Sequence, residues 1–327
     1  MIDAPGPWGT GPFVLTEGYS TITKRTDEVV MEPNETYWDP ARKPKVRIVY
    51  NNALSKEEAI VAVTDGRVDV VLDLTVDQAR DFDGKGKASI HAKAAKTLLA
   101  GMFNENKPNS PWTDPELRRA MNMAMDRKML IEKGAYGYAT EMAGLIQTGR
   151  YGADESMKAY ERDVAAAKVV IEKADIPGRE VMILASPDWK SLVEAMAECL
   201  KDVGLTVKAD YSKTEPEGWD IKLVWHFDWS PQFPVGVVHR EMFGANGGLR
   251  SSPADNVFDA LYSKLLKTPH EPAQEHVVKE VERYVFDQAK VLFLFSPHNL
   301  SAVSNRVDFV AYDTCMSELA ETTIKAG

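Results

Sequence analysis

The residues best suited to chemistry gather in the ten-residue stretch WHFDWSPQFP, from Trp225 to Pro234. Aromatic rings provide flat apolar contact area and lose little side-chain entropy when they are ordered. The carboxylate of Asp228 suits an ammonium group or hydroxyl groups. One interpretation is therefore the wall of a ligand site, formed by Trp225, His226, Phe227, Asp228, Trp229 and Phe233. The other, equally open, is that the rings cap the end of a sheet while Asp228 accepts backbone N–H groups in a turn.

The position of this stretch in the chain bears on that choice. It follows the predicted strand 219–225, and Pro231 and Pro234 prevent the strand from continuing. In open α/β sheets, ligands bind in the crevice beyond the carboxyl ends of the strands. The sequence thus predicts that the stretch lies where a ligand would bind.

Three further residues follow predicted strands and are weaker candidates for a site. Asn104 could donate amide hydrogen bonds or simply form a turn. Trp189 and Lys190 begin a helix and are interpreted as a core aromatic residue beside a solvated amine. His226, Asp228 and His239 have only a loose zinc-like spacing without a cysteine, so we expect no metal.

Motifs of the common enzyme classes are absent from the sequence. There is no nucleophile elbow, Walker A motif or dinucleotide fingerprint, and the six histidines form no HExxH. The glycine-rich WGTGPF carries Pro12 where a phosphate cradle needs an N–H donor. We therefore expect a protein that is not an enzyme and needs no cofactor.

Composition restricts the possible partners. With 327 residues the chain is long enough for two domains, and 44% hydrophobic with 27% charged residues is ordinary for a globular protein. A net charge of −10 argues against nucleic acid and anionic lipid as partners, because both need clustered Lys and Arg. No apolar run approaches the ~20 residues of a membrane span, and no signal peptide is recognisable in the chain as given.

The predicted elements alternate between strands and helices. Strands are expected at 13–19, 28–33, 45–51, 68–74, 179–186, 205–211, 219–225, 290–298 and 300–307, and helices at 55–66, 113–125, 126–131, 154–174, 186–204, 254–267 and 272–288. Ser55 and Glu58 form a capping box, and Thr113 is expected to cap the helix that contains Pro115. The order strand, helix, strand over residues 45–74 predicts a βαβ unit and hence α/β architecture.

Several motifs, in order along about 300 of the 327 residues, resemble the family 5 extracellular solute-binding proteins of ABC importers. GTGPFVL with NETYWDP is similar to the GTGPY…NPxYW segment of this family, and EEAIVAVTDGRVDVV to its helix–strand pattern. The most diagnostic stretch is FNENKPNSPWTDPELRRAMNMAMDRKMLI. RDVAAAKVVIEKADIPG and AECLKDVGLTVKAD follow two further family patterns.

The resemblance implies a type II periplasmic-binding-protein-like fold, in which two α/β lobes close over a solute. It places residues 1–95 and 290–327 in a first lobe and 96–289 in a second. It implies capture of a small polar solute, delivery to ABC permease subunits, and a periplasmic or extracellular location. In peptide binders of the family the aspartate that matches Asp228 holds the α-ammonium, with aromatic residues stacking on the solute.

Two departures from the family pattern modify this expectation. GTGPF begins at residue 9, so we expect the front of the first lobe to be missing, with self-association through the incomplete lobe. No arginine stands where peptide binders hold the carboxylate, and Lys190 is the nearest cation, which favours an opine or sugar-like solute over a free dipeptide. The alternative function is a truncated relative that acts as a protein-interaction module without transport activity.

Overall fold

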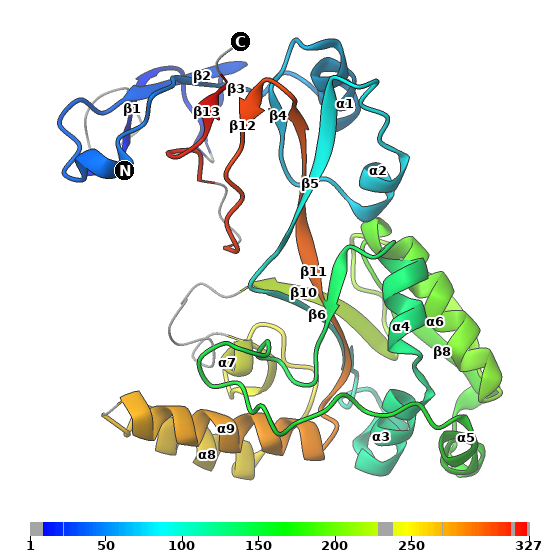
Figure 1. Cartoon of the computed structure of the whole chain (residues 1–327). Coiled ribbons are helices and arrows are strands. Elements are labelled where there is room, and N and C mark those ends of the chain that lie inside the picture. The colour runs from blue at the N-terminus through cyan, green and yellow to red at the C-terminus, as the bar shows by residue number, and fades with distance from the viewer. Residues whose placement is uncertain (1–8, 22, 228–237, 270, 315–317, 326–327) are drawn as a thin grey trace. The chain divides into compact units, whose positions relative to one another are not determined.

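The chain forms two compact units in the computed structural model, which describes residues 9–21, 23–227, 238–269, 271–314 and 318–325. The first unit comprises residues 1–93 and 299–327, and the second comprises residues 94–298 (Figure 1). The expected lobe boundary near residue 95 lies close to this division. The segment 290–298, expected in the first lobe, belongs to the second unit.

A three-stranded antiparallel sheet begins the first unit. Its strands are β1 (Phe13–Glu17), β2 (Glu28–Pro33) and β3 (Ile48–Asn51), in the order β1-β2-β3. The predicted hairpin is confirmed, since Phe13 pairs with Pro33 and Leu15 with Met31. A short 3₁₀ turn, Pro40–Arg42, lies between β2 and β3.

The expected βαβ unit is wrong, although its helix is right. Helix α1 (Lys56–Asp65) has the predicted capping box at Ser55 and Glu58 and ends at Gly66, whose φ of 82° suits glycine. Strand β4 (Val70–Val71), however, pairs antiparallel with a strand near the C-terminus and not with β3. The apolar run 68–74 predicted burial without specifying which strand would be its neighbour.

The remaining elements of this unit are short. They are α2 (Val76–Asp81), β5 (Ala88–Ala94), β12 (Val307–Asp308) and β13 (Thr323–Ile324). Strand β5 pairs with β11 (Val291–Ser304), and β12 pairs with β13. The single strand β11 replaces the two strands predicted at 290–298 and 300–307.

A mixed sheet forms the centre of the second unit. Strand β6 (Thr97–Phe103) lies between β11 and β10 (Ile221–Phe227) and is antiparallel to both, while β10 is followed by β8 (Glu180–Leu184) and β9 (Thr206–Asp210), which run parallel to it. Strand β7 (Ala139–Glu141) pairs with β11. Every residue of β6 is buried, as expected for a strand covered on both faces.

Helices cover both faces of this sheet. Figure 1 shows α7 (Val238–Phe243), α8 (Asn256–Leu266) and α9 (Glu271–Asp287) on one side, and α4 (Arg127–Met129), α5 (Val164–Lys173) and α6 (Lys190–Asp202) on the other. Side chains of α7, α8 and α9 pack with alternate residues of β6, Leu98, Ala100 and Met102, in one apolar core.

Two helix predictions need correction. Helix α3 (Pro115–Ala124) is capped by Asp114, whose carboxylate accepts from Glu116 N at 2.9 Å, because Thr113 belongs to the 3₁₀ turn before it. The helix expected over 154–174 begins only at Val164. Asp154 bonds the N–H and hydroxyl of Ser156 in a local turn, and Asp163 caps α5 instead.

The most diagnostic family stretch, Phe103–Ile131, holds the second unit together through buried polar groups. The guanidinium of Arg118 donates to the carbonyls of Trp112, Gln288 and Ala289 and faces the carboxylate of Glu105 at 3.4 Å. Asn122 donates to Val291 O and accepts from Phe293 N, each at 2.9 Å, and so joins α3 to β11.

A second arginine of this stretch serves the same purpose. Arg127 donates to Tyr160 O at 2.7 Å, and burial lowers its pKa to about 10. The segment is therefore a structural hub, and its two buried arginines bond to the protein's own backbone.

Candidate functional site

The end of β10 meets the start of β6 and brings two distant parts of the chain together. In the antiparallel register His226 pairs with Leu98 and Phe227 with Thr97. Lys96 directly precedes that strand. A pocket forms here, lined by Lys96, Thr97, Leu98, Leu145, Ile146, Gln147, Arg150, His226, Phe227 and Val238.

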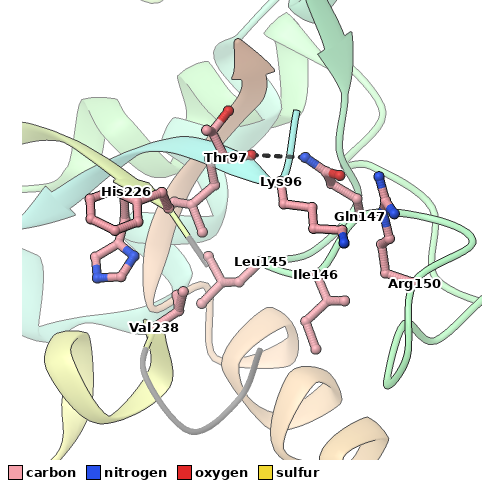
Figure 2. A pocket seen from close by; sticks show the side chains of 10 residues that line it. Lys96, Thr97, Leu145, Ile146, Gln147, Arg150, His226 and Val238 are labelled. Atoms are coloured by element: carbon pink, nitrogen blue, oxygen red, sulfur yellow. Dashed lines mark hydrogen bonds between the residues drawn. The ribbon is translucent and has the colours of Figure 1, made fainter. Parts of the chain in front are cut away.

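The pocket has one side with cations and one that is mainly apolar. Figure 2 shows Lys96, Gln147 and Arg150 on one side and His226 and Val238 on the other. Its volume is about 400 Å³, counting space open to solvent. Small-molecule sites likewise combine apolar walls with a few polar groups.

The segment 144–150, called here the pocket wall, is fixed in place at two points. The first is buried Glu282 of α9, whose Oε2 accepts from Leu145 N at 3.0 Å and Ile146 N at 3.1 Å. Its Oε1 bonds Nε2 of the fully buried His239 of α7. Gly144 lies so close to this carboxylate that a side chain there would collide with it.

The second fixed point is Gln147. Its amide nitrogen donates to Thr97 O at 2.9 Å, to Ala95 O and to the hydroxyl of Ser296. The first of these bonds is drawn in Figure 2. These carbonyls lie on either side of Lys96, so one glutamine joins the backbone of Lys96 to the pocket wall that carries Arg150.

His226 is the titratable aromatic residue of the pocket. Partial burial lowers its pKa, and a backbone hydrogen bond at Phe227 and the nearby charge of Glu241 oppose this only in part. Its Nδ1 is buried and has no hydrogen-bond partner among the described residues. A neutral imidazole at this position can donate a hydrogen bond to a ligand or accept one from it.

The structure places the other residues of the aromatic stretch only in part. Trp225 is 43% exposed, and its ring lies 5.1 Å from that of Phe227. Because side chains alternate along a strand, it faces the side of the sheet opposite to His226. Asp228, Trp229 and Phe233 lie outside the described residues.

Asn104, Trp189 and Lys190 lie away from this pocket. Asn104 is buried level with Asp220, at the other end of β10 and roughly 20 Å from Phe227 along the strand. Its amide donates to Trp219 O at 3.0 Å. Half-buried Trp189 packs edge-on against Phe295, and Lys190 is exposed at the start of α6.

Within the described part of the chain, no group of three or more His, Cys, Asp or Glu side chains is arranged to hold a metal ion. None of its helices is both long and apolar enough to span a bilayer. The loosely spaced His239 bonds Glu282.

Sequence reasoning found His226 and Phe227 but missed most of the pocket. Lys96, Gln147 and Arg150 belong to no motif. The only available signal was that Lys96 and Thr97 directly precede a strongly apolar run. Their proximity depends on pairing between strands more than a hundred residues apart, which no local pattern reveals.

The fold belongs to the class of periplasmic-binding-protein-like α/β structures. The ABC transporter substrate-binding protein CtaP of Listeria monocytogenes matches with a TM-score of 0.78 at 17% identity, over 91% of this chain and 62% of that one. NikA of Brucella suis, solved with Fe(III)-EDTA, also gives 0.78, at 20% identity, over 97% and 68%. The expected fold class is thereby confirmed.

Residues 3–240 match the family described as bacterial extracellular solute-binding proteins, family 5. This match covers well over half of the chain, which therefore belongs to that family. The assignment confirms the resemblance read from the motifs and places the chain among solute-binding proteins rather than enzymes.

Curated relatives agree with this assignment. The probable D,D-dipeptide-binding periplasmic protein DdpA of Escherichia coli K12 is 22% identical, over 95% of this chain and 61% of its own length. The nickel-binding periplasmic protein of the same strain is 23% identical, over 88% and 59%. The chain thus spans about 60% of the length of these relatives.

Proposed function

We propose that this chain is the solute-binding component of an ABC importer and captures a small polar solute. The supporting observation is a family match over residues 3–240 together with a pocket at the carboxyl end of β10, where solutes bind in α/β folds. Its partners would be ABC permease subunits, and its location the periplasm or the cell exterior. The two lobes, with residues 290–298 in the second, would close over the solute.

Asp228 would hold a cationic group of the solute, with Trp225, His226, Phe227, Trp229 and Phe233 providing aromatic contact. Asn104, Trp189 and Lys190 are secondary candidates, because their described positions are away from the pocket. No cofactor or bound metal is part of this proposal. A peptide, an opine or a sugar-like molecule would fit it.

The relatives' names support a small solute without naming it. They include binders of D,D-dipeptide, nickel and glutathione. The rival function, an interaction module without transport activity, gains no support from the comparisons, and neither does self-association. Light scattering would measure the latter directly.

A binding screen tests the proposal. Thermal shift and calorimetry would be applied to the full chain with dipeptides, opines, sugars and nickel–histidine complexes. We expect at least one class to bind, and Asp228→Asn to weaken the binding of a cationic member at least about tenfold, the loss of one charged hydrogen bond. If no class raises the melting temperature, the proposal is wrong.

A further inference from the structure

We infer that the pocket at the start of β6 binds an anionic oxygen group, a carboxylate or a phosphate ester, carried on a small apolar skeleton. This inference rests on the proposed solute-binding function and specifies the class of solute. It is carried by the placement of Lys96 and Arg150 on one side of a pocket whose other walls are largely hydrocarbon.

The charge of the pocket contrasts with that of the chain. The protein carries a net charge of −10, yet among the ten described residues that line this pocket two are basic and none is acidic. A guanidinium and an ammonium beside partly enclosed apolar surface are the groups that recognise carboxylate and phosphate oxygens. Because surrounding apolar atoms exclude water, such contacts are stronger there than on an open surface.

The backbone segments that carry the two cations are held together. Gln147 donates to the carbonyls of Ala95 and Thr97, on either side of Lys96, and is itself three residues from Arg150. Glu282 fixes the preceding residues Leu145 and Ile146 through their N–H groups. Preorganisation of this kind reduces the entropy lost when a ligand is bound.

The apolar walls define the rest of the ligand. Leu98, Leu145, Ile146 and Val238 offer only hydrocarbon, whereas His226 and Phe227 add aromatic surface at the strand end. A small acid with an aliphatic or aromatic portion satisfies both sides. A fully polar sugar would leave the hydrocarbon walls uncovered.

Matched probes test the inference on the full chain. Calorimetry and ligand-observed NMR would compare four probes: the acid N-acetyl-L-leucine, the neutral amide N-acetyl-L-leucinamide, the amine L-leucinamide, and hexyl phosphate. We expect the acid or the phosphate to bind at least about tenfold more tightly than the amide, as for loss of a charged contact. The ratio of acid to phosphate affinity distinguishes the two anion types.

Variants at Lys96 and Arg150 then test whether these two residues produce the preference for an anion. Lys96→Gln and Arg150→Gln should each reduce the anion-over-amide ratio several-fold, while Lys96→Arg should retain it. Lys128→Gln, at an exposed position in the same unit, removes the same charge and should leave the ratio unchanged. Melting temperatures identify any variant that fails to fold. If a Gln variant fails to fold, the anion-over-amide ratio of Lys96→Arg is measured in its place.

The outcomes separate this inference from the proposed function. Equal binding of acid and amide, or a preference that survives both Gln variants, overturns the inference alone. So does preferential binding of the amine or of neutral solutes in the wider screen. Failure of every solute class overturns the proposed function as well.

Discussion

The diagnostic segment Phe103–Ile131 and the pocket wall 144–150 lie in the same unit, but their polar residues have different tasks. In the diagnostic segment Arg118, Asn122 and Arg127 are buried. They bond to backbone groups of the turn after α9, of β11 and of Tyr160, respectively. In the pocket wall, Gln147 and Arg150 line a pocket. The stretch that identifies the family therefore maintains the fold, whereas the solute preference proposed above depends on residues outside it.

The largest expected effect comes from removing the buried charge at Arg118. Arg118→Met would leave Glu105 and three backbone carbonyls without this donor. We expect the free energy of unfolding in urea to fall by about 3–5 kcal/mol, as for breaking a buried ion pair. Anion-over-amide preference should be unchanged wherever the variant remains folded.

Arg119→Met is the matched control for this change. It lies next in the same helix, and its partly exposed side chain pairs with Glu116 and donates to Asp287 O. Its loss should cost less than about 1 kcal/mol. Equal losses for the two variants would contradict the distinction between hub and surface.

Glu282→Gln should affect both stability and binding. The amide retains one acceptor for the N–H groups of Leu145 and Ile146 but loses the charge that faces His239. We expect a loss of about 2–3 kcal/mol and weaker binding of N-acetyl-L-leucine, measured by urea unfolding and calorimetry. Glu275→Gln, on the exposed side of the same helix, should change neither.

Gln147→Leu should separate the two regions most clearly. The lost bonds to Ala95 O and Thr97 O should cost about 1 kcal/mol of stability. Because these bonds fix Lys96 relative to the pocket wall, affinity for the acid should fall several-fold. Gln274→Leu removes a comparable amide–carbonyl bond far along the chain, to Thr268 O, and should spare affinity. A Gln147→Leu protein with unchanged affinity would show that the wall does not position the cations.

The smallest expected effect is a pH dependence at His226. Its pKa in the folded chain is lowered by burial, so the unfolded chain takes up the proton first as pH falls. Its contribution to stability is complete above about pH 6.5 and is lost as pH falls through the lower folded pKa. His226→Gln should flatten the fall of unfolding free energy below pH 6.5.

Two other histidines contribute to the same pH dependence of stability. His91 and His298 also have pKa values lowered by burial, so the variant should remove only part of the slope. His276→Gln, at an exposed position on α9, serves as the control. An unchanged slope in His226→Gln would contradict the burial of this imidazole.

Local signals in the sequence predicted much of the fold. Ser55 and Glu58 act within a few residues of each other, so their capping box could be recognised and is present. Prediction failed where competing local bonds or distant partners decide. Asp154 and Ser156 form a turn in place of the first helical turns, and β4 pairs with β11, more than 200 residues away.

The candidate site was predictable to a lesser degree. His226 and Phe227 could be found because a strand end rich in aromatic residues is a local pattern. Lys96 and Arg150 could not, because they come together through the register of β6 with β10 and the side chain of Gln147. Neither carries a motif of its own.

Gln147 offers a practical route to new sensors. One amide nitrogen has three oxygen acceptors around it, from Ala95, Thr97 and Ser296. A shorter or longer side chain at this position would change the spacing of two cations without replacing either. A library confined to residue 147 would therefore sample different anion sizes while the rest of the scaffold stays constant.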